Sequence, residues 1–342
     1  MAEEVTSTPW PGELNILDYL YPELLVEIFE YLTLTELKQV TLVCKRFNEC
    51  AYSPKLWTEV VFCWPEACIK KAVVTSVVER GIRKLSVVAK SEDQLCKALL
   101  ALPGLRYLRL DLDNFNGKQD PLKVLKSCNF SALKTLVLVW FLEKQDLYNR
   151  SRLGEFFELF PKVNSFHWHS SKYCRHYRDK AFQTTTNQEL QAVFDKFTTL
   201  KTLELSFKDI DALTVLHLQL DTLTTLILGI KFVDEKMLRA IGPMFPRLSS
   251  LEFYDCQFFE MDLEHECREH LSQLQTLTFD RCSIWIWTCS GIYQSTTSVN
   301  FDFKIRVSEF DQIDSLIYGP NCPWVNFIES EKVLKLNSRP TL

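Results

Sequence analysis

Residues 233–256 read V-D-E-K-M-L-R-A-I-G-P-M-F-P-R-L-S-S-L-E-F-Y-D-C. Within this stretch, Leu248–Phe253 (LSSLEF) carries apolar residues at its first, fourth and sixth positions. Because successive side chains of a strand point to opposite faces, the fourth and sixth side chains share one face and the fifth points away. The frame therefore predicts a short strand with one buried face, preceded by a segment that is often helical.

The same six-residue frame recurs along most of the chain. Clear copies are Ile82–Val87, Leu105–Leu110, Leu133–Leu138, Val163–Trp168, Leu200–Leu205, Leu223–Leu228, Leu248–Phe253 and Leu274–Phe279. Degenerate copies are Trp57–Phe62, Thr296–Phe301 and Glu331–Leu336. Successive frames begin 22 to 37 residues apart, which indicates a repeat architecture.

Stacking of these repeats determines the expected fold. One strand and one helix cannot close a hydrophobic core, but stacked copies share a continuous one. The frames therefore predict a curved parallel sheet on the inside, covered by helices on the outside. The clearest expected helix is Ser308–Tyr318, which starts at a capping serine and stops before Gly319–Pro320.

Two cysteines follow strands at the same place, since Cys256 and Cys282 each stand three positions after the last residue of a frame. In this feature the unit at 233–256 resembles the cysteine-containing leucine-rich repeats of F-box proteins. The resemblance implies an α/β leucine-rich-repeat horseshoe of about ten to eleven irregular copies over residues 57–342, with an insertion near 170–190. We expect both cysteines to be small buried residues that turn the chain away from the strand.

Short helices are expected near the amino terminus. Pro22 suits the first turn of a helix, Thr33 with Glu36 can form a capping box for the next, and Ser53–Pro54 suits the start of a third. Apolar residues recur at helical spacing in the first two, at Leu24, Leu25, Ile28, Phe29 and Leu32, then at Leu37, Val40, Cys44 and Phe47. Helices this short cannot bury all these side chains among themselves, so some must face a partner or the next domain.

The segment 16–62 resembles the F-box, with E-L-L-V-E-I-F-E-Y-L at 23–32, L-V-C-K-R-F at 42–47 and P-K-L-W at 54–57. The family usually begins with Leu-Pro, whereas Tyr21 stands before the proline here. The resemblance implies that this module binds the Skp-type adaptor of a cullin–RING ubiquitin ligase. The expected adaptor-binding residues are mostly apolar: Leu20, Pro22, Leu24, Leu25, Ile28, Phe29, Leu32, Leu37, Val40, Cys44, Phe47, Leu56 and Trp57. Residues 1–15 are expected to be flexible.

The composition, with 342 residues of which 46% are hydrophobic and 24% charged, is that of an ordinary soluble chain. The net charge of −5 argues against binding driven mainly by nucleic-acid phosphates. Residues 1–13 lack the basic start of a secretory signal, and the strongest apolar run, 136–142, is too short to cross a bilayer. Twelve scattered cysteines without a C-x-x-C pair favour free thiols. We expect a cytoplasmic or nuclear protein that binds no membrane.

No set of catalytic residues assembles in the sequence. His265 and His270 stand five positions apart, about 140° off one helical face, whereas a zinc-protease helix needs histidines four apart. Neither a glycine-rich phosphate loop nor a G-x-S-x-G motif occurs. We therefore expect a non-catalytic protein with no cofactor and no metal site.

The outward fifth and seventh positions of the frames predict a substrate-binding surface on the inner face of the sheet. The candidate residues are Arg109, Asp111, His167, His169, Glu204, Glu252, Tyr254, Asp280 and Asp302. Our hypothesis is that this face binds a basic or hydrogen-bond-donating segment, with Tyr254 as an aromatic anchor. The alternative is a solvated face with no partner.

Two further features leave alternatives open. His167 and His169 lie two apart on one side of a strand, but no third metal ligand is identifiable, so partner contact or solvent exposure is favoured over metal ligation. The insertion near 170–190 is basic and aromatic, and suits an acidic degron, a phosphate or RNA, or is a solvated loop.

The two resemblances together imply the expected function. A module that binds an adaptor and a repeat array that binds a protein are the two parts of the substrate-recognition subunit of an SCF-type ubiquitin ligase. The alternative is an F-box and repeat scaffold that binds partners without promoting their ubiquitination.

Overall fold

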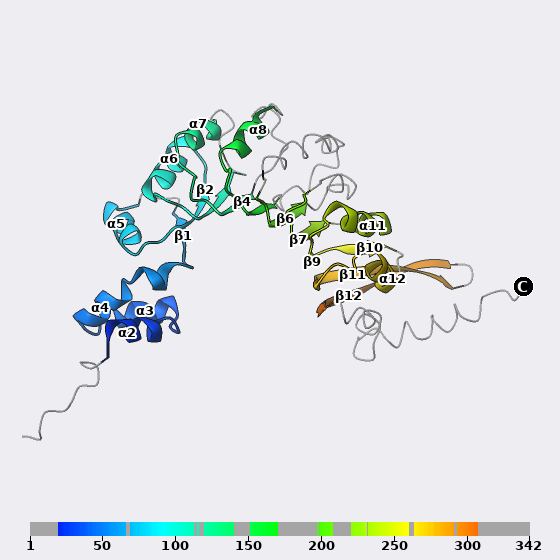
Figure 1. The fold of residues 1–342 in the computed structure, drawn as a ribbon, viewed down its shortest axis with the longest axis horizontal. Helices are drawn as coiled ribbons and strands as arrows, with labels where there is room; N and C mark the ends of the chain where they lie inside the picture. Colours follow the sequence, from blue (N-terminus) through cyan, green and yellow to red (C-terminus); the bar gives the residue numbers. More distant parts are fainter. Residues whose placement is uncertain are drawn as a thin grey trace, which may run out of the picture. The chain divides into compact units, whose positions relative to one another are not determined.

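The computed structural model describes residues 20–65, 69–112, 115, 120–139, 151–169, 197, 199–207, 220–230, 232–259, 263–290 and 293–306 (Figure 1). The chain divides into two compact units. The helical unit comprises residues 1–62 and 67–84, and the repeat unit comprises residues 63–66 and 85–342. The expectations for 1–15, 170–190, Ser308–Tyr318 and Glu331–Leu336 lie outside the described residues.

The helical unit contains α2 (Pro22–Phe29), α3 (Leu34–Val40), α4 (Lys45–Ala51), the 3-10 helix η1 (Pro54–Trp57) and α5 (Lys71–Glu79). Pro22 occupies the first turn of α2, and the predicted capping box is confirmed: the Glu36 amide donates to the Thr33 hydroxyl at 3.3 Å, and the Thr33 amide donates to the Glu36 carboxylate at 2.7 Å. The second expected helix is two helices, because Cys44 caps α4 by accepting a hydrogen bond from the Phe47 amide.

A small core holds the helical unit together. Its buried members are Leu25, Phe29, Leu37, Cys50 and Ala51. The Phe29 and Phe47 rings pack edge to face at 5.4 Å between centroids, which favours the attraction between ring edge and ring face. The side chain of Trp57 packs against this core and donates a hydrogen bond from Nε1 to the Ala51 carbonyl at 2.8 Å.

The repeat unit is built on a sheet whose strands are β1 (Val61–Trp64), β2 (Lys84–Val88), β3 (Tyr107–Asp111), β4 (Thr135–Val139), β5 (Ser165–His169), β6 (Thr202–Phe207), β7 (Thr225–Ile230), β8 (Phe232–Val233), β9 (Ser250–Tyr254), β10 (Gln257–Phe259), β11 (Thr276–Ser290) and β12 (Tyr293–Arg306). The strand order is β1-β2-β3-β4-β5-β6-β7-β9-β11-β10-β8, with β12 paired to β11. From β3 to β11 the principal ladders are parallel and in register, so equivalent frame positions lie side by side.

The strand predictions from the eight clear frames are confirmed. In each, the observed strand begins at the third position of the frame. The side chains at the fourth and sixth positions are buried in every copy, among them Leu85, Phe166, Trp168 and Phe253. The degenerate copy Trp57–Phe62 is displaced, because Trp57 belongs to η1 and the strand starts only at Val61.

Helices α6 (Glu92–Ala101), α7 (Pro121–Lys126), α8 (Ser151–Glu158), α11 (Glu235–Met244) and α12 (Leu263–His270) cover one face of the curved sheet, as predicted (Figure 1). Side chains just before α6, α7 and α11 satisfy free amides at the amino ends of these helices, as when the Asp234 carboxylate accepts from the Met237 amide at 2.9 Å. Among the described helices, none combines the length and the apolar content that a bilayer span requires.

The chain turns sharply after β9 and after the first part of β11. Asp255 and Arg281 adopt positive φ angles of 53° and 51°, and each is followed by a buried cysteine. The thiol of Cys256 donates to the Leu228 carbonyl at 3.3 Å, and that of Cys282 to the Phe253 carbonyl at 3.3 Å. Burial raises the pKa of Cys256, so the predicted role as small structural residues is confirmed.

The carboxyl end departs from the predicted parallel order. Thr296–Phe301 was expected to be another repeat strand, but it lies within β12, which pairs antiparallel with β11. The physical reason is the connection: β11 ends at Ser290 and β12 begins at Tyr293, and a parallel partner would need a crossover of about a dozen residues.

Candidate functional site

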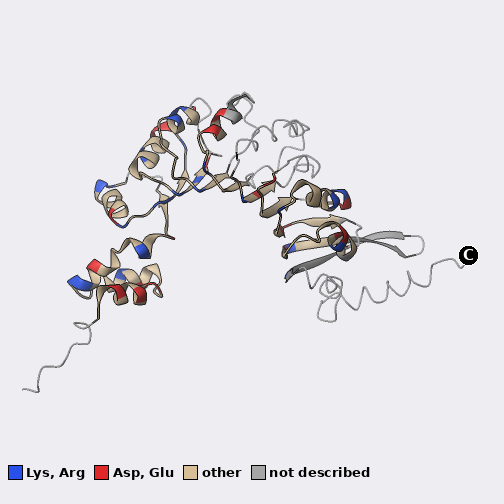
Figure 2. Ribbon diagram, viewed as in Figure 1, with Lys and Arg blue, Asp and Glu red and all other residues tan. Residues whose placement is uncertain are grey.

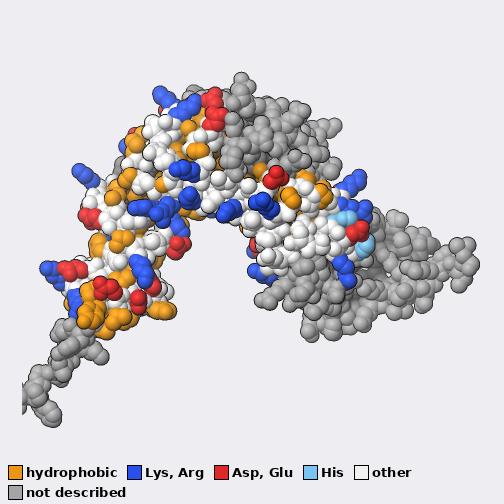
Figure 3. All heavy atoms as spheres, in the orientation of Figure 1, with side chains coloured by type: hydrophobic (Ala, Val, Ile, Leu, Met, Phe, Trp, Pro, Cys, Tyr) orange, Lys and Arg blue, Asp and Glu red, His pale blue; other side chains and the backbone are white. Residues whose placement is uncertain are grey.

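The helical unit exposes apolar side chains that its own core does not use. Leu24 and Ile28 on α2 are 44% and 48% exposed, and Tyr31 is 90% exposed. Leu34, Leu42 and Val43 are also exposed. Figure 3 shows hydrophobic side chains gathered along the edge of this unit at α2 and α3. Exposed apolar surface of this extent marks an interaction site.

Burial divides the predicted adaptor-binding residues into three groups. Leu25, Phe29 and Leu37 are only 2%, 4% and 2% exposed, so the expectation that they lie on the docking face needs correction. They point into the core of the unit, Leu25 and Phe29 from α2 and Leu37 from α3, because both helices pack against α4. Partly buried around the same core are Leu20, Leu32, Val40, Phe47, Leu56 and Trp57, whereas Pro22, Leu24, Ile28 and Cys44 are exposed.

Charged residues surround the exposed apolar side chains. The acidic Glu23 and Glu27 lie on α2, and the basic Lys45 and Arg46 lie on α4 (Figure 2). A groove between α2 and α4 is lined by Glu23, Glu27, Arg46, Glu49 and Lys55, among others. Lys55 pairs with Glu30 at 2.7 Å, and the Arg46 guanidinium donates to the Leu20 carbonyl. These polar groups can orient a partner on an otherwise apolar surface.

The repeat unit brings four predicted substrate-binding residues together on the helix-free face of the sheet. We call His167, His169, Glu204 and Tyr254 the β5–β6–β9 cluster. The two histidines project from β5, and Glu204 lies directly opposite His167 on β6. His167 Nδ1 lies 2.5 Å from Glu204 Oε2, and His169 Nε2 lies 3.5 Å from Glu204 Oε1. Glu204 is thus the centre of the cluster.

Two hydroxyl groups complete the cluster. Tyr254, from β9, donates to Glu204 Oε1 at 3.1 Å, and Ser165 bonds to His167 Nε2 at 2.8 Å. The Tyr254 ring reaches β6 because it lies over Gly229 of β7, where a Cβ atom would stand 2.7 Å from the tyrosine hydroxyl. Sequence reasoning missed Gly229, although a glycine inside a strand is a signal of close approach.

The cluster shifts the ionisation of its members. Burial opposes the charged form of Glu204, but the hydrogen bond from His167 and the nearby imidazoles lower its pKa overall. Burial lowers the pKa of His169, more than the Glu204 charge raises it. Burial also raises the pKa of Tyr254, so its hydroxyl stays a hydrogen-bond donor at neutral pH.

The other predicted substrate-binding residues lie outside the cluster, although the charge of Arg109 acts on His169 and that of Glu204 acts on Glu252. Arg109 is exposed on β3, and Asp111 is half-buried at the end of the same strand. Glu252 is half-buried on β9, where burial and the neighbouring Asp280 charge raise its pKa. Asp280 forms an ion pair with Arg281 at 3.5 Å. Asp302 lies within β12, so its expected place in a parallel repeat strand is wrong.

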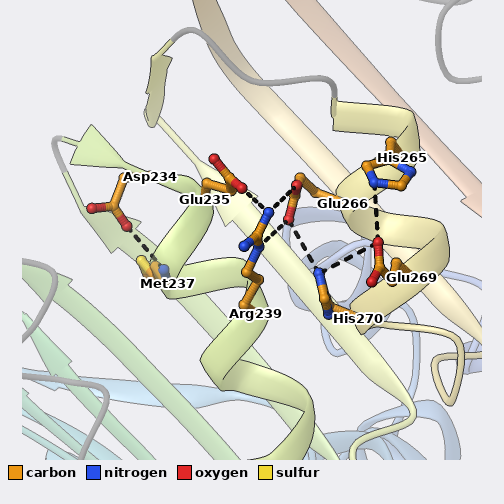
Figure 4. Close-up of polar contacts among 8 residues, drawn as sticks. All are labelled: Asp234, Glu235, Met237, Arg239, His265, Glu266, Glu269 and His270. Carbon is orange, nitrogen blue, oxygen red and sulfur yellow. Dashed lines mark hydrogen bonds and ion pairs between the residues drawn. The ribbon is translucent and has the colours of Figure 1, made fainter.

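His265 and His270 of α12 share the Glu269 carboxylate, and His270 also faces Glu266 (Figure 4). Among the described residues, they are not part of a group with metal-ligand spacing. His265 pairs with Glu269 at 3.0 Å, while His270 lies 3.4 Å from the buried Glu266. Glu266 in turn accepts two hydrogen bonds from Arg239 of α11, both at 3.1 Å. Figure 4 shows that Arg239 and Glu266 join α11 to α12, the helices of successive repeats. We therefore assign this group a structural role.

A parallel sheet of in-register repeats with helices on one face defines the leucine-rich-repeat class. A helical module with its own core precedes it, and residues 17–63 match the family model described as F-box-like. The protein therefore carries an F-box-like domain followed by a leucine-rich-repeat fold. Both modules are typically non-catalytic interaction modules, which makes a protein-interaction or adaptor role the general function.

Solved structures with a similar arrangement are distant. The leucine-rich-repeat protein LegL7 from Legionella pneumophila shares 12% identity over 66% of this chain and 86% of that chain, with a TM-score of 0.40. The Rad7 and Elc1 complex of yeast gives 15% identity over 79% and 73%, with a TM-score of 0.40. The TLR13–ssRNA13 complex gives 14% over 68% and 34%, with a TM-score of 0.37. Among curated proteins, none matches at a significant level.

Proposed function

We propose that this protein is the substrate-recognition subunit of an SCF-type cullin–RING ubiquitin ligase. The F-box-like domain binds the Skp-type adaptor, and the repeat unit binds the protein to be ubiquitinated. The observation that carries the proposal is the exposure of Leu24, Ile28 and Tyr31 on a domain that matches the F-box-like model. Adaptor, cullin and RING subunits supply the remaining machinery, in the cytoplasm or the nucleus.

The energetics of the exposed face support a stable interface. Complete burial of a Leu or Ile side chain contributes about 1.5–3 kcal/mol, and those at Leu24 and Ile28 retain nearly half of that gain for a partner. With Tyr31, Leu34, Leu42 and Val43 added, the face can offset the several kcal/mol that association costs.

The chain's contribution to ubiquitin transfer is binding and placement. A substrate held on the repeat unit is brought near the charged conjugating enzyme, which converts an encounter into an effectively intramolecular step. We propose the helix-free face, with Glu204, Glu252 and Asp280, as the substrate-binding surface, and a basic or hydrogen-bond-donating segment as its ligand.

The adaptor face is tested by a double substitution. Leu24→Asp with Ile28→Asp adds two charges to exposed positions of α2 without entering the core, and is expected to abolish co-purification with the Skp-type adaptor and the cullin. The matched control is Val73→Asp with Val78→Asp on α5, since both valines are 44% exposed in the same unit. Unchanged adaptor binding in the α2 variant, or equal loss in both, overturns the proposal.

Ligase and scaffold are separated by ubiquitin transfer. The purified assembly of adaptor, cullin, RING subunit and this chain is expected to ubiquitinate proteins that bind the repeat unit, and those proteins should accumulate when the gene is removed. Partners that bind the repeat unit but gain no ubiquitin and do not accumulate indicate the scaffold instead.

A further inference from the structure

We propose that His167, His169 and Glu204 form a binding site for a zinc-type divalent transition-metal ion on the helix-free face of the repeat unit. One ligand atom from each residue can be chosen so that all lie within 4.8 Å of one another. Two imidazoles and one carboxylate make up a donor set that zinc takes in proteins, with a fourth position open. The imidazoles favour zinc and related ions over calcium and magnesium, which prefer oxygen ligands alone.

The third ligand comes from a neighbouring strand. His167 and His169 share a face because they stand two apart on β5, and Glu204 is the residue paired with His167 on β6. His167 and Glu204 stand 37 residues apart in the sequence, so no local motif indicates that they lie together. Beneath it, Phe166 and Trp168 of β5 and Leu203 of β6 are fully buried, so the backbone that carries the ligands is fixed by a packed core.

The nitrogen atoms already face the carboxylate that would share the ion. His167 Nδ1 and His169 Nε2 lie 2.5 Å and 3.5 Å from the two oxygens of Glu204. Ligands at about 2.0–2.2 Å from a tetrahedral ion stand roughly 3.3 Å apart. The ion therefore requires the His167–Glu204 contact to widen by less than about 1 Å and the longest separation in the group, at most 4.8 Å, to shorten by up to about 1.5 Å. Side-chain rotation supplies that movement without a change in the strands.

Outer-sphere hydrogen bonds hold the ligands in place. With Nδ1 of His167 turned to the ion, its Nε2–H donates to the Ser165 hydroxyl, which lies 2.8 Å away. The Tyr254 hydroxyl donates to Glu204 Oε1 at 3.1 Å. Partners of this kind fix the ring tautomer and the carboxylate orientation at metal sites, and their removal typically weakens binding by about 10–100-fold.

The site is also accessible. The side chains of His167, His169 and Glu204 are 20%, 28% and 16% exposed, enough for an ion to enter from solvent while most of the cluster stays covered. The fourth position therefore opens onto the helix-free face, where a water molecule or a side chain of a bound protein can occupy it.

Metal binding by the purified full chain, stripped by a chelator, tests the site. We expect one equivalent of Zn²⁺ to compete with a chromophoric chelator, and Co²⁺ to give tetrahedral ligand-field bands without thiolate charge-transfer bands. Tyr254→Phe should weaken Zn²⁺ binding by about 10–100-fold, and Glu204→Gln and His169→Asn, which remove direct ligands, should each weaken it more. The matched control, His265→Asn with Glu269→Gln, removes a histidine–carboxylate pair from α12 and should leave binding unchanged.

Thermal unfolding adds a second readout of the same site. Zn²⁺ should raise the unfolding temperature of the unmodified chain but not that of Glu204→Gln, since an ion that binds only the folded state stabilises it. Thiolate bands in the Co²⁺ spectrum, no binding at one equivalent, or full binding by a folded Glu204→Gln variant each overturn the proposal. Adaptor co-purification is independent of these measurements, so the proposed function and the metal site fail separately.

Discussion

The helical unit and the repeat unit use apolar residues in different ways. In the repeat unit, the apolar positions of every clear frame are buried, and the helix-free face carries histidine, carboxylate and hydroxyl groups beside Val137 and Val139. In the helical unit, the apolar stripe of α2 is split: Leu25 and Phe29 enter the core, while Leu24 and Ile28 remain at the surface. A repeat can bury its apolar edge against the next repeat, whereas the short helices of the helical unit have no further copy to pack against.

Because the two units expose different kinds of side chain, we propose that they recognise their partners in different ways. The helical unit offers apolar surface, which is non-directional and yields affinity through burial. The repeat unit offers a few oriented polar groups held by a rigid sheet, which discriminate between ligands through hydrogen bonds, charge or metal coordination. The apolar face of the helical unit suits a single constant partner, and the polar face of the repeat unit suits a partner chosen for its chemistry.

The largest expected effect contrasts two neighbours on α2. Phe29→Ala removes a ring from the core of the helical unit and is expected to destabilise that unit by about 3–5 kcal/mol. Ile28→Ala should cost about 1 kcal/mol or less, because the side chain is already half in water. Thermal unfolding and adaptor binding are measured on both: Ile28→Ala should weaken adaptor binding while leaving the unfolding temperature nearly unchanged. Similar losses of stability in the two variants would contradict the division of α2 into a buried and an exposed side.

The β5–β6–β9 cluster requires a glycine at position 229, because the Tyr254 ring lies where a side chain would stand. Gly229→Ala places a methyl group against the Tyr254 ring, and overpacking of this kind costs about 1–3 kcal/mol. Combining it with Tyr254→Ser removes the ring, so the alanine should then cost less than about 1 kcal/mol in a double-mutant cycle of unfolding free energies. An equal cost in both backgrounds would mean that the ring does not lie over this glycine.

Helix caps in the two units provide an intermediate comparison. Thr33→Ala removes the capping box of α3, and Asp234→Ala removes the cap of α11, so each should cost about 0.5–2 kcal/mol of stability. Loss of the Thr33 cap should also weaken adaptor binding, because α3 carries the exposed Leu34. Binding is measured with purified adaptor, and Asp234→Ala is the control expected to bind normally.

The sequence predicted strands better than it predicted surfaces. Alternation at 248–253 and its copies identifies strand and buried face together, because both follow from the pleat. However, alternation does not show whether a strand runs parallel or antiparallel to its neighbour. Thr296–Phe301 therefore fitted the frame although β12 runs antiparallel to β11. Helical spacing marked Leu25 and Ile28 alike, since periodicity shows an apolar stripe but not which part of it the chain itself covers.

The candidate site shows the same limit. His167, His169 and Glu204 were each expected on the helix-free face, because the frame positions place them there. Their contact required the register between β5 and β6, and this depends on how the 37-residue step between the two frames returns to the sheet. Tyr254 was expected as an exposed anchor, but a glycine on the neighbouring strand β7 lets it bond to Glu204 instead.

The smallest expected effect concerns the pH dependence of the polar face. Burial, with the charges of Asp280 and Glu204, raises the pKa of Glu252, so the folded chain binds its proton more tightly than the unfolded chain does. The contribution of this carboxyl group is therefore greatest below its unfolded pKa of about 4.3, and is lost as the pH rises through the raised folded pKa. Glu252→Gln should slightly raise the unfolding temperature at pH 7, and the difference should vanish near pH 4. In the apolar face of the helical unit, Ile28→Ala should shift stability equally at both pH values, because no proton is involved. Unfolding curves of the three chains at the two pH values measure this difference, and a stabilisation by Glu252→Gln that persists at pH 4 would show that ionisation of Glu252 is not its cause.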